Sequence, residues 1–317
     1  MTKKNIKIIA YNSNWPKMFD AESQSIRLIL GSKLLEIHHV GSTSVTGLAS
    51  KNKIDIVAVV KNGKDSIKPL EEIGYTYKGE WNVPLKFGFT KRGEVNVNLH
   101  VFEENHPEIE VLVKFRDYLR VNSVVRDQYA ALKEQILTDE TSMKKSANGF
   151  LYKYTLLKGD FIRSVLKQAG FNRIRILKCS DDSEWRAARR FRNQYFFEPQ
   201  NIDDPYTWTF NHSEHAHLAL YKGAEIIGYA HIQFWPNNKA AMRIIVIDAN
   251  KQRQGYGGKF LLLIEQWLKN LEIKTVHTES KPSSLKFYAK NSYSEMPFHD
   301  PDGHESDLRD VAVGKIL

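Results

Sequence analysis

The residues best suited to chemistry form a glycine-containing loop in the second half of the chain. The β-branched run at residues 241–248 predicts a strand buried on both faces. Directly after it, residues 250–258 open an apolar helix predicted over 259–269. At such a junction the unpaired backbone N–H groups and the helix dipole favour an anion such as pyrophosphate. Gly255 and Gly257 would let the backbone approach a phosphate, although a purely structural turn explains such glycines equally well.

A second group of candidate residues lies in the first half of the chain. Gly41 and Ser42 follow a predicted strand and could offer N–H and hydroxyl groups to a phosphate. Asp55 is flanked by β-branched residues, so a strand displays its carboxylate, as in transferases that hold Mg²⁺. Such sites normally use two carboxylates, and Val57 stands where the second is expected. Two interpretations stay open: a phosphate or magnesium site at Asp55 and His100, or a polar network with a structural role.

Two arginines extend this second group. Arg116 and Arg120 are four residues apart on a predicted helix, so their side chains lie on one face. They could bind phosphate, or acids such as Asp117 and Glu110 could pair with them.

The elements that must position these residues predict an α/β fold (α+β) in two domains. Residues 157–168 have the apolar periodicity of a helix, and Gly170 stands where its C-cap is expected. A strand pattern then restarts at 174–179. This restart places the boundary at about residue 170 and gives domains 1–170 and 171–317. The second domain then continues as helix, two or three strands, helix, strand, helix and strand.

Two motifs of the second domain occur in the order typical of one family. The residues Gln252-Arg-Gln-Gly-Tyr-Gly257 fit the pattern Gln/Arg-x-x-Gly-x-Gly/Ala, and residues 284–293 resemble the segment Ala-x-x-Phe-Tyr-x-Lys-x-Gly-Phe. Ser292 and Tyr293 replace the last two residues of that segment. The domain thus resembles the GNAT superfamily of N-acetyltransferases, which implies a splayed mixed sheet, acetyl-CoA as cofactor and an amine as acceptor.

The resemblance also assigns roles to single residues. The backbone of the central strand would bond the pantetheine arm, and the loop after it would cradle the pyrophosphate. Tyr288 would be the general acid at the departing sulfur, because a phenol with a pKa of about 10 can protonate a thiolate. A core aromatic residue on an amphipathic helix is the alternative for Tyr288. The implied cofactor-binding residues are Ile245, Ile247, Gln252, Arg253, Gln254, Gly255, Tyr256, Gly257 and Gly258.

The residue that deprotonates the acceptor amine is not evident from the sequence. Arg243 occupies the central strand, where no glutamate occurs. His231, His277 and Glu279 remain candidates that could act through a water. The acidic tail at residues 299–307 could rim the acceptor site and suit a cationic amine, or it could form a solvated loop.

The first domain carries a different family pattern. The run His39-Val-Gly-Ser-Thr-Ser-Val-Thr-Gly-Leu48, the motif at residues 115–120 (Phe-Arg-Asp-Tyr-Leu-Arg), Lys51 and Asp55 resemble the GrpB family (UPF0157). That family is a relative of the nucleotidyltransferase superfamily, which implies a nucleotidyltransferase-like mixed sheet with helices. The missing second acid belongs to the family pattern itself, so membership does not imply transferase chemistry. The candidate ligand residues are Gly41, Ser42, Lys51, Asp55, His100, Arg116 and Arg120.

Composition narrows the setting. The net charge is +9, and residues 1–170 hold 26 Lys and Arg against 19 Asp and Glu, which suggests a nucleotide, phosphate or RNA partner for the first domain. A solvated lysine-rich surface is the alternative. The single cysteine favours a reducing, cytoplasmic location and excludes a cysteine-built metal site. No apolar run is long enough for a membrane span, so no membrane partner is expected.

These observations support three hypotheses. The first is a two-domain enzyme in which the second domain acetylates an amine and the first binds a nucleotide or RNA end. The second makes the first domain a ligand-binding, regulatory module without catalysis. The third makes the second domain a sensor of acetyl-CoA rather than an enzyme.

Overall fold

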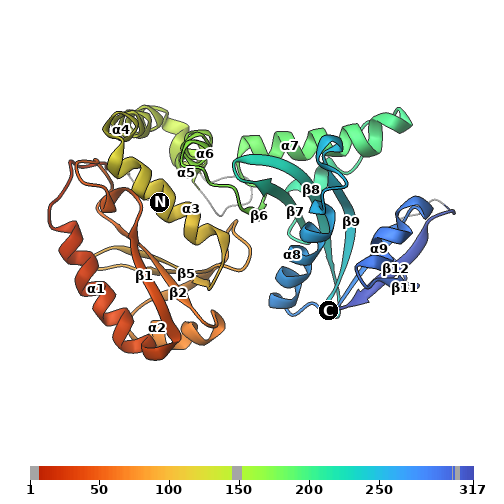
Figure 1. The fold of residues 1–317 in the computed structure, drawn as a ribbon, viewed down its shortest axis with the longest axis horizontal. Coiled ribbons are helices and arrows are strands. Elements are labelled where there is room, and N and C mark those ends of the chain that lie inside the picture. The colour runs from red at the N-terminus through yellow and green to blue at the C-terminus, as the bar shows by residue number, and fades with distance from the viewer. Residues whose placement is uncertain (1–6, 145–151, 302, 304–307) are drawn as a thin grey trace. The chain divides into compact units, whose positions relative to one another are not determined.

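The chain forms two compact units that divide between Ile174 and Arg175, in a computed structural model that describes residues 7–144, 152–301, 303 and 308–317. Each unit contains one sheet with helices (Figure 1). The predicted α/β fold with two sheets is confirmed. We keep residue 170 as the proposed domain boundary, because it lies between α6 (Gly159–Gln168) and β6 (Ile174–Lys178), the first strand of the second sheet.

The N-terminal sheet is mixed and has the strand order β1-β2-β5-β4-β3. The central strands β2 and β5 run parallel, and the other neighbours run antiparallel. The five strands are β1 (Leu34–Val40), β2 (Ile54–Val60), β3 (Thr76–Gly79), β4 (Phe87–Lys91) and β5 (Val97–Glu103).

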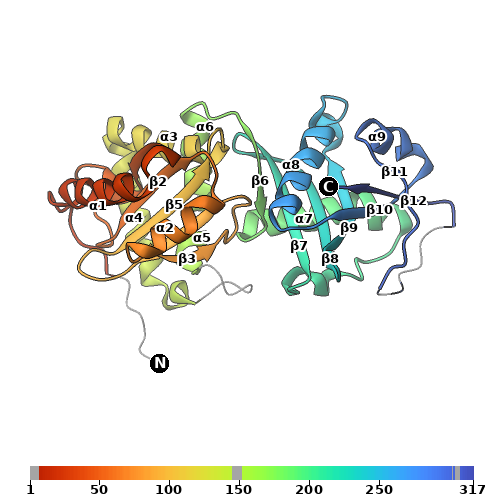
Figure 2. The same ribbon diagram turned by 90° about the horizontal axis from the view of Figure 1, so that it is seen from below.

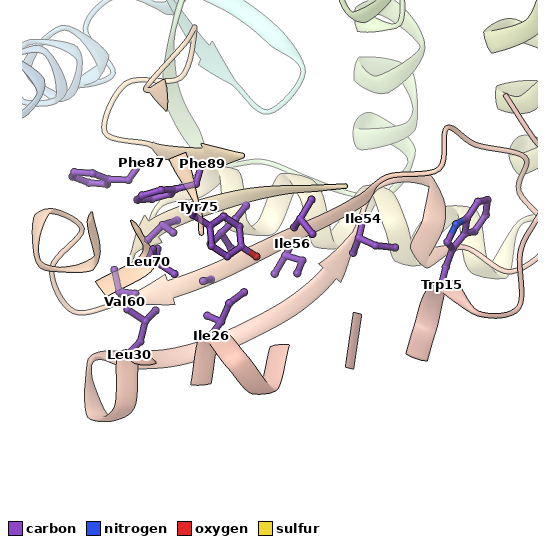
Figure 3. Close-up of a cluster of buried hydrophobic side chains, with 14 residues drawn as sticks. Trp15, Ile26, Leu30, Ile54, Ile56, Val60, Leu70, Tyr75, Phe87 and Phe89 are labelled. Carbon is purple, nitrogen blue, oxygen red and sulfur yellow. The ribbon is translucent and has the colours of Figure 1, made fainter. Parts of the chain in front are cut away.

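The core of this unit follows from side-chain alternation in β2. Ile54 and Ile56 point to a buried cluster that includes residues of α1 (Trp15–Leu30) and α2 (Ile67–Glu72), as Figure 3 shows. Val57 belongs to the opposite face, which packs against α3 (Pro107–Val121). Because side chains alternate, Asp55 shares this opposite face with Val57.

Three more helices complete the N-terminal unit: α4 (Ser123–Thr138), α5 (Lys153–Leu156) and α6. Tyr129 of α4 packs with Leu119 of α3, with Phe161 of α6 and with Val45 and Leu48 of the segment after β1. This packing brings α4 and α6 next to the Gly41–Ser42 turn.

The C-terminal sheet has seven strands in the order β11-β12-β10-β9-β8-β7-β6. The pair β9–β10 is parallel, and the pairs on either side of it are antiparallel. The remaining strands are β7 (His215–Lys222), β8 (Glu225–Trp235), β9 (Lys239–Ile247), β10 (Thr275–Ser280), β11 (Ser294–Glu295) and β12 (Val311–Ile316).

Three helices accompany this sheet: α7 (Asp182–Arg192), α8 (Tyr256–Asn270) and α9 (Leu285–Lys290). A capping box starts α7, because Asp181 accepts from the N–H of Glu184 and the Glu184 carboxylate accepts from the N–H of Asp181. Helix α8 lies across the strands β7–β9 in Figure 2, and its Trp267 packs edge-to-face on Phe234 of β8. Helix α8 therefore joins the end of β9 to the start of β10 across one face of the sheet.

Candidate functional site

The central feature of the C-terminal unit is the divergence of β9 and β10. The two strands pair only from Thr275 to His277, opposite residues 239–241. Beyond that point β9 stays paired with β8, and β10 stays paired with β12. Where the strands separate, Thr278 Oγ1 donates to Met242 O at 2.8 Å. The edge of β9 after Met242 therefore lacks a neighbouring strand on the β10 side within these fully described segments.

The backbone of this edge points toward the separated strand. The Asp248 N–H donates to Ile227 O of β8 at 2.9 Å. Because alternate residues of a strand direct their backbone groups to the same side, Ile245 and Ile247 direct theirs away from β8. Ile247 O accepts from Gln252 Nε2 at 2.9 Å. The backbone groups of Ile245 and the N–H of Ile247 therefore point toward the side on which β10 has separated from β9.

A tight loop follows β9 and leads into α8. Gly255 is the N-cap of α8 with φ +81°, a left-handed conformation that glycine adopts without strain, and no side chain caps the helix. Gln252, Arg253, Gln254 and Gly255 are exposed. The N–H groups of the first turn thus have no side-chain cap, so the loop presents donors and the positive end of a helix dipole to an anion.

Gly257 is a glycine for a reason that the sequence did not suggest. A Cβ at this position would lie 3.1 Å from Phe287 of α9 and 4.0 Å from Ile247. At Gly258 a Cβ would lie 3.3 Å from Asn291 Oδ1. A side chain at Gly257 would therefore crowd Phe287 of α9 and one at Gly258 would crowd Asn291, whereas the left-handed φ accounts for Gly255.

Tyr288 lies at the divergence of the two strands. Its ring is buried, and its hydroxyl shares a hydrogen bond with Thr278, whose own hydroxyl donates to Met242 O. Burial raises the pKa of Tyr288, and the bond with Thr278 offsets part of that rise. The phenol therefore stays protonated at neutral pH and can donate a proton there.

Arg243 of β9 acts electrostatically on one of the candidate bases, His231. Arg243 pairs with Asp300, and its Nε donates to Gln233 Oε1 at 2.8 Å. Asp300 belongs to the acidic tail and is buried by this ion pair, so it is not part of a solvated loop. Residue 302 and residues 304–307 of that tail lie outside the described part. Burial lowers the pKa of His277, and it lowers that of His231 well below the ordinary value.

A buried polar network that sequence reasoning missed lies beside His231. Arg192 of α7 forms a bidentate ion pair with Asp204, with Nε–Oδ2 at 2.6 Å and Nη2–Oδ1 at 2.8 Å. The ring nitrogens of His231 lie 3.3 Å from Arg192 Nη1 and 2.9 Å from His215 Nδ1. His217 Nδ1 lies 2.6 Å from the Tyr229 hydroxyl. Neighbouring protein groups thus engage these histidines.

In the N-terminal unit, Asp55 is held by neighbours on the same sheet face. Its Oδ1 accepts from Asn98 Nδ2 at 2.8 Å and lies 3.9 Å from His100 Nε2. Burial alone would raise the pKa of Asp55, but His100, Lys53 and Asn98 lower it to about 2. A Cβ on Gly41 would lie 2.6 Å from Asp55 Oδ2, and Gly41 has φ +70°. Gly41 and Asp55 are therefore close neighbours, as the sequence motif suggested.

Arg116 and Arg120 hold the turn after β1 through its carbonyl oxygens. Arg116 Nη1 donates to His39 O at 3.0 Å, and Arg120 Nε and Nη2 donate to Ser44 O at 3.0 and 2.8 Å. Arg116 also binds Asp117 through two further bonds of 2.7 and 3.0 Å. The hydrogen bonds of the two arginines hold the turn in place, and Arg116 also pairs with Asp117. These contacts favour the structural interpretation of Arg116 and Arg120 over phosphate binding.

A magnesium site at Asp55 is not supported. Among the residues that the structure describes, no group of three or more His, Cys, Asp or Glu side chains is placed to hold a metal ion. The position of the second acid is filled by Val57, which is buried. The contacts of the Asp55 carboxylate in the described structure are with Asn98 and His100.

Two family models match the chain. Residues 5–168 match the model for GrpB protein, and residues 166–293 match the model for the acetyltransferase (GNAT) family. A UPF0157 protein of Halalkalibacterium halodurans is 35% identical over 168 residues, which cover 52% of this chain and 83% of that protein.

Solved structures resemble each half of the chain. The crystal structure of GrpB from Enterococcus faecalis shares 30% identity and covers 51% of this chain and 96% of its own, with a TM-score of 0.45. The structure of an acetyltransferase of the GNAT family from Staphylococcus aureus shares 17% identity and covers 46% of this chain and 99% of its own, with a TM-score of 0.37. Across the described residues, the helices are too short or too polar to cross a membrane.

Proposed function

We propose, on the premise that the chain belongs to the GrpB family and carries a GNAT acetyltransferase domain after it, that the C-terminal unit transfers an acetyl group from acetyl-CoA to an amine. The observation that carries this proposal is the divergence of β9 and β10 next to the side-chain-free N-cap of α8. The single cysteine, Cys179, is buried, and burial raises the pKa of its thiol, so it acts as a packing residue. A reducing, cytoplasmic location belongs to the same proposal.

The residues present fit acetyl-CoA. The exposed loop and the first turn of α8 would hold the pyrophosphate, and the backbone of Ile245 and Ile247 would hold the pantetheine arm. When bound, the cofactor supplies the acetyl group as an activated thioester. The loop offers its N–H groups without a side-chain competitor, which is the property that an anion needs.

The chain supplies the proton transfers of the reaction. Tyr288 would protonate the departing sulfur, because it is buried, protonated and located where β9 and β10 separate. Backbone donors on the open edge of β9 would stabilise the negative charge that develops on the acyl oxygen. The base that takes the proton from the amine through a water is one of the three candidates, His231, His277 or Glu279.

Calorimetric titration of acetyl-CoA tests this proposal. The variant Gln254→Glu adds a negative charge beside the helix N-terminus with almost no change in shape, and we expect about ten-fold weaker binding or more. Gln200→Glu is the matched control, because Gln200 is also exposed and also donates to a backbone carbonyl four residues away. Equal affinities for the two variants, or no binding to the folded wild type, would reject the proposed cofactor site.

For the N-terminal unit we propose binding of a nucleotide or another phosphate ligand without catalysis. The engagement of the lone acid Asp55 by Asn98 and His100 favours this module over a nucleotidyltransferase. The candidate residues for the ligand are Gly41, Ser42 and Lys51, beside Asp55. An assay for nucleotide turnover with and without Mg²⁺ checks this proposal, and metal-dependent turnover would contradict it.

A further inference from the structure

Three lysines from separate parts of the N-terminal unit converge beside the Gly41–Ser42 turn. Lys133 of α4 donates from Nζ to Ser42 Oγ at 3.3 Å and to Ala49 O. Lys51, before β2, and Lys158, at the N-cap of α6, both approach the ring of Tyr154, with Nζ at 3.9 and 4.6 Å from the ring centroid. The ammonium group of Lys133 lies 5.0 Å from the Tyr129 ring. We call Lys51, Lys133 and Lys158 the lysine cluster.

The cluster has more positive charge than the surrounding residues balance. Within the described part of the unit, Lys51 and Lys158 form no ion pair or side-chain hydrogen bond, and both ammonium groups lie over the Tyr154 ring. Asp55 is the acid that acts on Lys51 and Lys158, but Asn98 and His100 already engage its carboxylate. The charged or titratable groups that act on the cluster are Lys53, Asp55, Glu134, Tyr129 and Tyr154.

The electrostatic cost of this arrangement is visible in the lysine pKa values. Burial, followed by repulsion from neighbouring lysines, lowers the pKa of Lys51 to about 7. The same two causes lower the pKa of Lys133 to about 7. Burial also lowers the pKa of Lys158 to about 8. The neighbouring residues thus disfavour the charged form of these lysines, and a bound anion would favour it.

We infer that Lys51, Lys133 and Lys158, together with the Ser42 hydroxyl, form a binding site for a multiply charged phosphate group. Three compact ammonium groups that act on one another suit a ligand that spreads two or more negative charges over several oxygens. Gly41 has no Cβ to obstruct the turn, and the two tyrosine rings wall the site with apolar surface. This inference rests on the ligand-binding role proposed for the N-terminal unit and does not depend on acetyl transfer.

Neither Lys133 nor Lys158 was among the candidates from sequence. Lys133 lies in the middle of α4 and Lys158 twenty-five residues further on, and nothing in their spacing relates them to Ser42. Only the packing of α4 and α6 on the segment after β1 brings them together.

Calorimetric titration of inorganic pyrophosphate into the full-length protein at pH 7 tests the inference. Lys158→Gln removes one charge of the cluster without removing a hydrogen bond, and we expect at least about ten-fold weaker binding. Lys68→Gln, at an exposed position of α2 in the same unit, should bind as the wild type does. Pyrophosphate that fails to bind the wild type, or that binds Lys158→Gln with unchanged affinity, would overturn the inference.

Two further measurements sharpen the outcome. Because a phosphate ligand favours charged lysines, binding at pH 8 should take up protons, seen as a dependence of the binding heat on the ionisation enthalpy of the buffer. Binding without proton uptake would overturn the role of the cluster. A titration with ATP at the same pH distinguishes two kinds of phosphate ligand. ATP that binds more tightly than pyrophosphate indicates a nucleotide as the ligand. ATP that binds equally or more weakly indicates a simple phosphate compound.

The test also separates this inference from the proposed acetyltransferase. Acetyl-CoA contains phosphates, so its titration is repeated with Lys158→Gln, whose affinity for acetyl-CoA should equal that of the wild type. Acetyl-CoA binding that disappears in Gln254→Glu while pyrophosphate fails to bind would overturn the phosphate site alone. Pyrophosphate binding that depends on Lys158 without any acetyl-CoA binding would overturn the acetyltransferase alone.

Discussion

At the scale of single residues, the proposed chemistry depends most directly on Tyr288. Its hydroxyl sits in a chain of polar groups that continues through Thr278 to the backbone of Met242. Burial keeps the phenol protonated, which a general acid requires, and the strands that diverge at Met242 provide the place where a thioester sulfur could approach it.

Replacement of Tyr288 by Phe should lower kcat by about 100-fold or more, because general acid catalysis typically contributes that much. The affinity for acetyl-CoA should not change. Steady-state kinetics with an amine acceptor and a titration of acetyl-CoA measure the two quantities. Tyr293→Phe is the control, since Tyr293 is also buried and its ring packs 5.4 Å from that of Tyr288. An unchanged kcat in Tyr288→Phe would assign the tyrosine to the core.

The loop after β9 and Tyr288 stay predictions for the site, and the sequence offers them because each belongs to a short, contiguous motif. Thr278, Lys133 and Lys158 were not among the candidates from sequence, because their roles come from contacts between residues far apart in the sequence. Lys133 and Ser42, for example, are 91 residues apart and meet at 3.3 Å. The sequence of a helix alone does not show which of its lysines is buried in the folded protein.

At the scale of elements, the ion pair between Arg192 and Asp204 ties α7 to the segment before β7. Arg192 is 1% exposed, and two short hydrogen bonds join it to Asp204. Burial alone would raise the pKa of Asp204, but the bonds from Arg192 and the N–H of Tyr206 lower it. The pair therefore fixes the position of this segment relative to β8, whose Tyr229 and His231 also contact Arg192.

Asp204→Ala should lower the free energy of unfolding by about 3–5 kcal/mol, because it leaves a buried guanidinium without its counter-charge. Denaturant-induced unfolding measures the loss. Asp248→Ala provides the comparison, since Asp248 pairs at 3.0 Å with Arg190 of the same helix, but near the surface. That variant should lose no more than about 1 kcal/mol. Equal losses of unfolding free energy in the two variants would show that burial does not increase the contribution of the Arg192–Asp204 pair to stability.

The order of the elements was predictable from hydrophobic periodicity, but the divergence of two of them was not. The β-branched run before the loop indicated a buried strand, and β9 confirms it. The separation of β10 from β9 after three paired residues depends on contacts with β12 and on the Thr278 side chain, which lie elsewhere in the sequence. The resemblance to the GNAT superfamily implied a splayed sheet. Hydrophobic periodicity alone predicted the two strands, but not that they separate.

At the scale of the whole molecule, titratable groups give the two-unit chain an unusual dependence on pH. The lysine cluster has folded-state pKa values of about 7, 7 and 8, below the ordinary value of 10.5. Between these values and about 10, the unfolded chain binds more protons than the folded chain, so stability rises as pH increases. Both families suggested by the sequence are confirmed by matching family models. The pH dependence of stability could not be predicted, because it depends on how deeply the lysines are buried in the folded chain.

We expect the free energy of unfolding, measured by denaturant titration without phosphate, to be higher at pH 9 than at pH 7. Buried histidines add to the same trend at lower pH, because the pKa of His39 falls to about 4. Lys158→Gln should show a smaller rise than the wild type, and Lys68→Gln the same rise. A pH-independent stability between 7 and 9 would mean that the lysines keep ordinary pKa values in the folded chain.

The lysine cluster also has a consequence for covalent reactivity. A lysine with a pKa of about 7 carries an unprotonated, nucleophilic amine in about half of the molecules at pH 7, against fewer than about one in a thousand for an ordinary lysine. Lys51 is partly accessible and should therefore be among the first side chains that acylating reagents or cyanate modify. Bound phosphate would favour the protonated form of this amine and shield it from reagents. The rate at which Lys51 is modified, read by peptide mass spectrometry, therefore reports whether the phosphate site of the N-terminal unit is occupied.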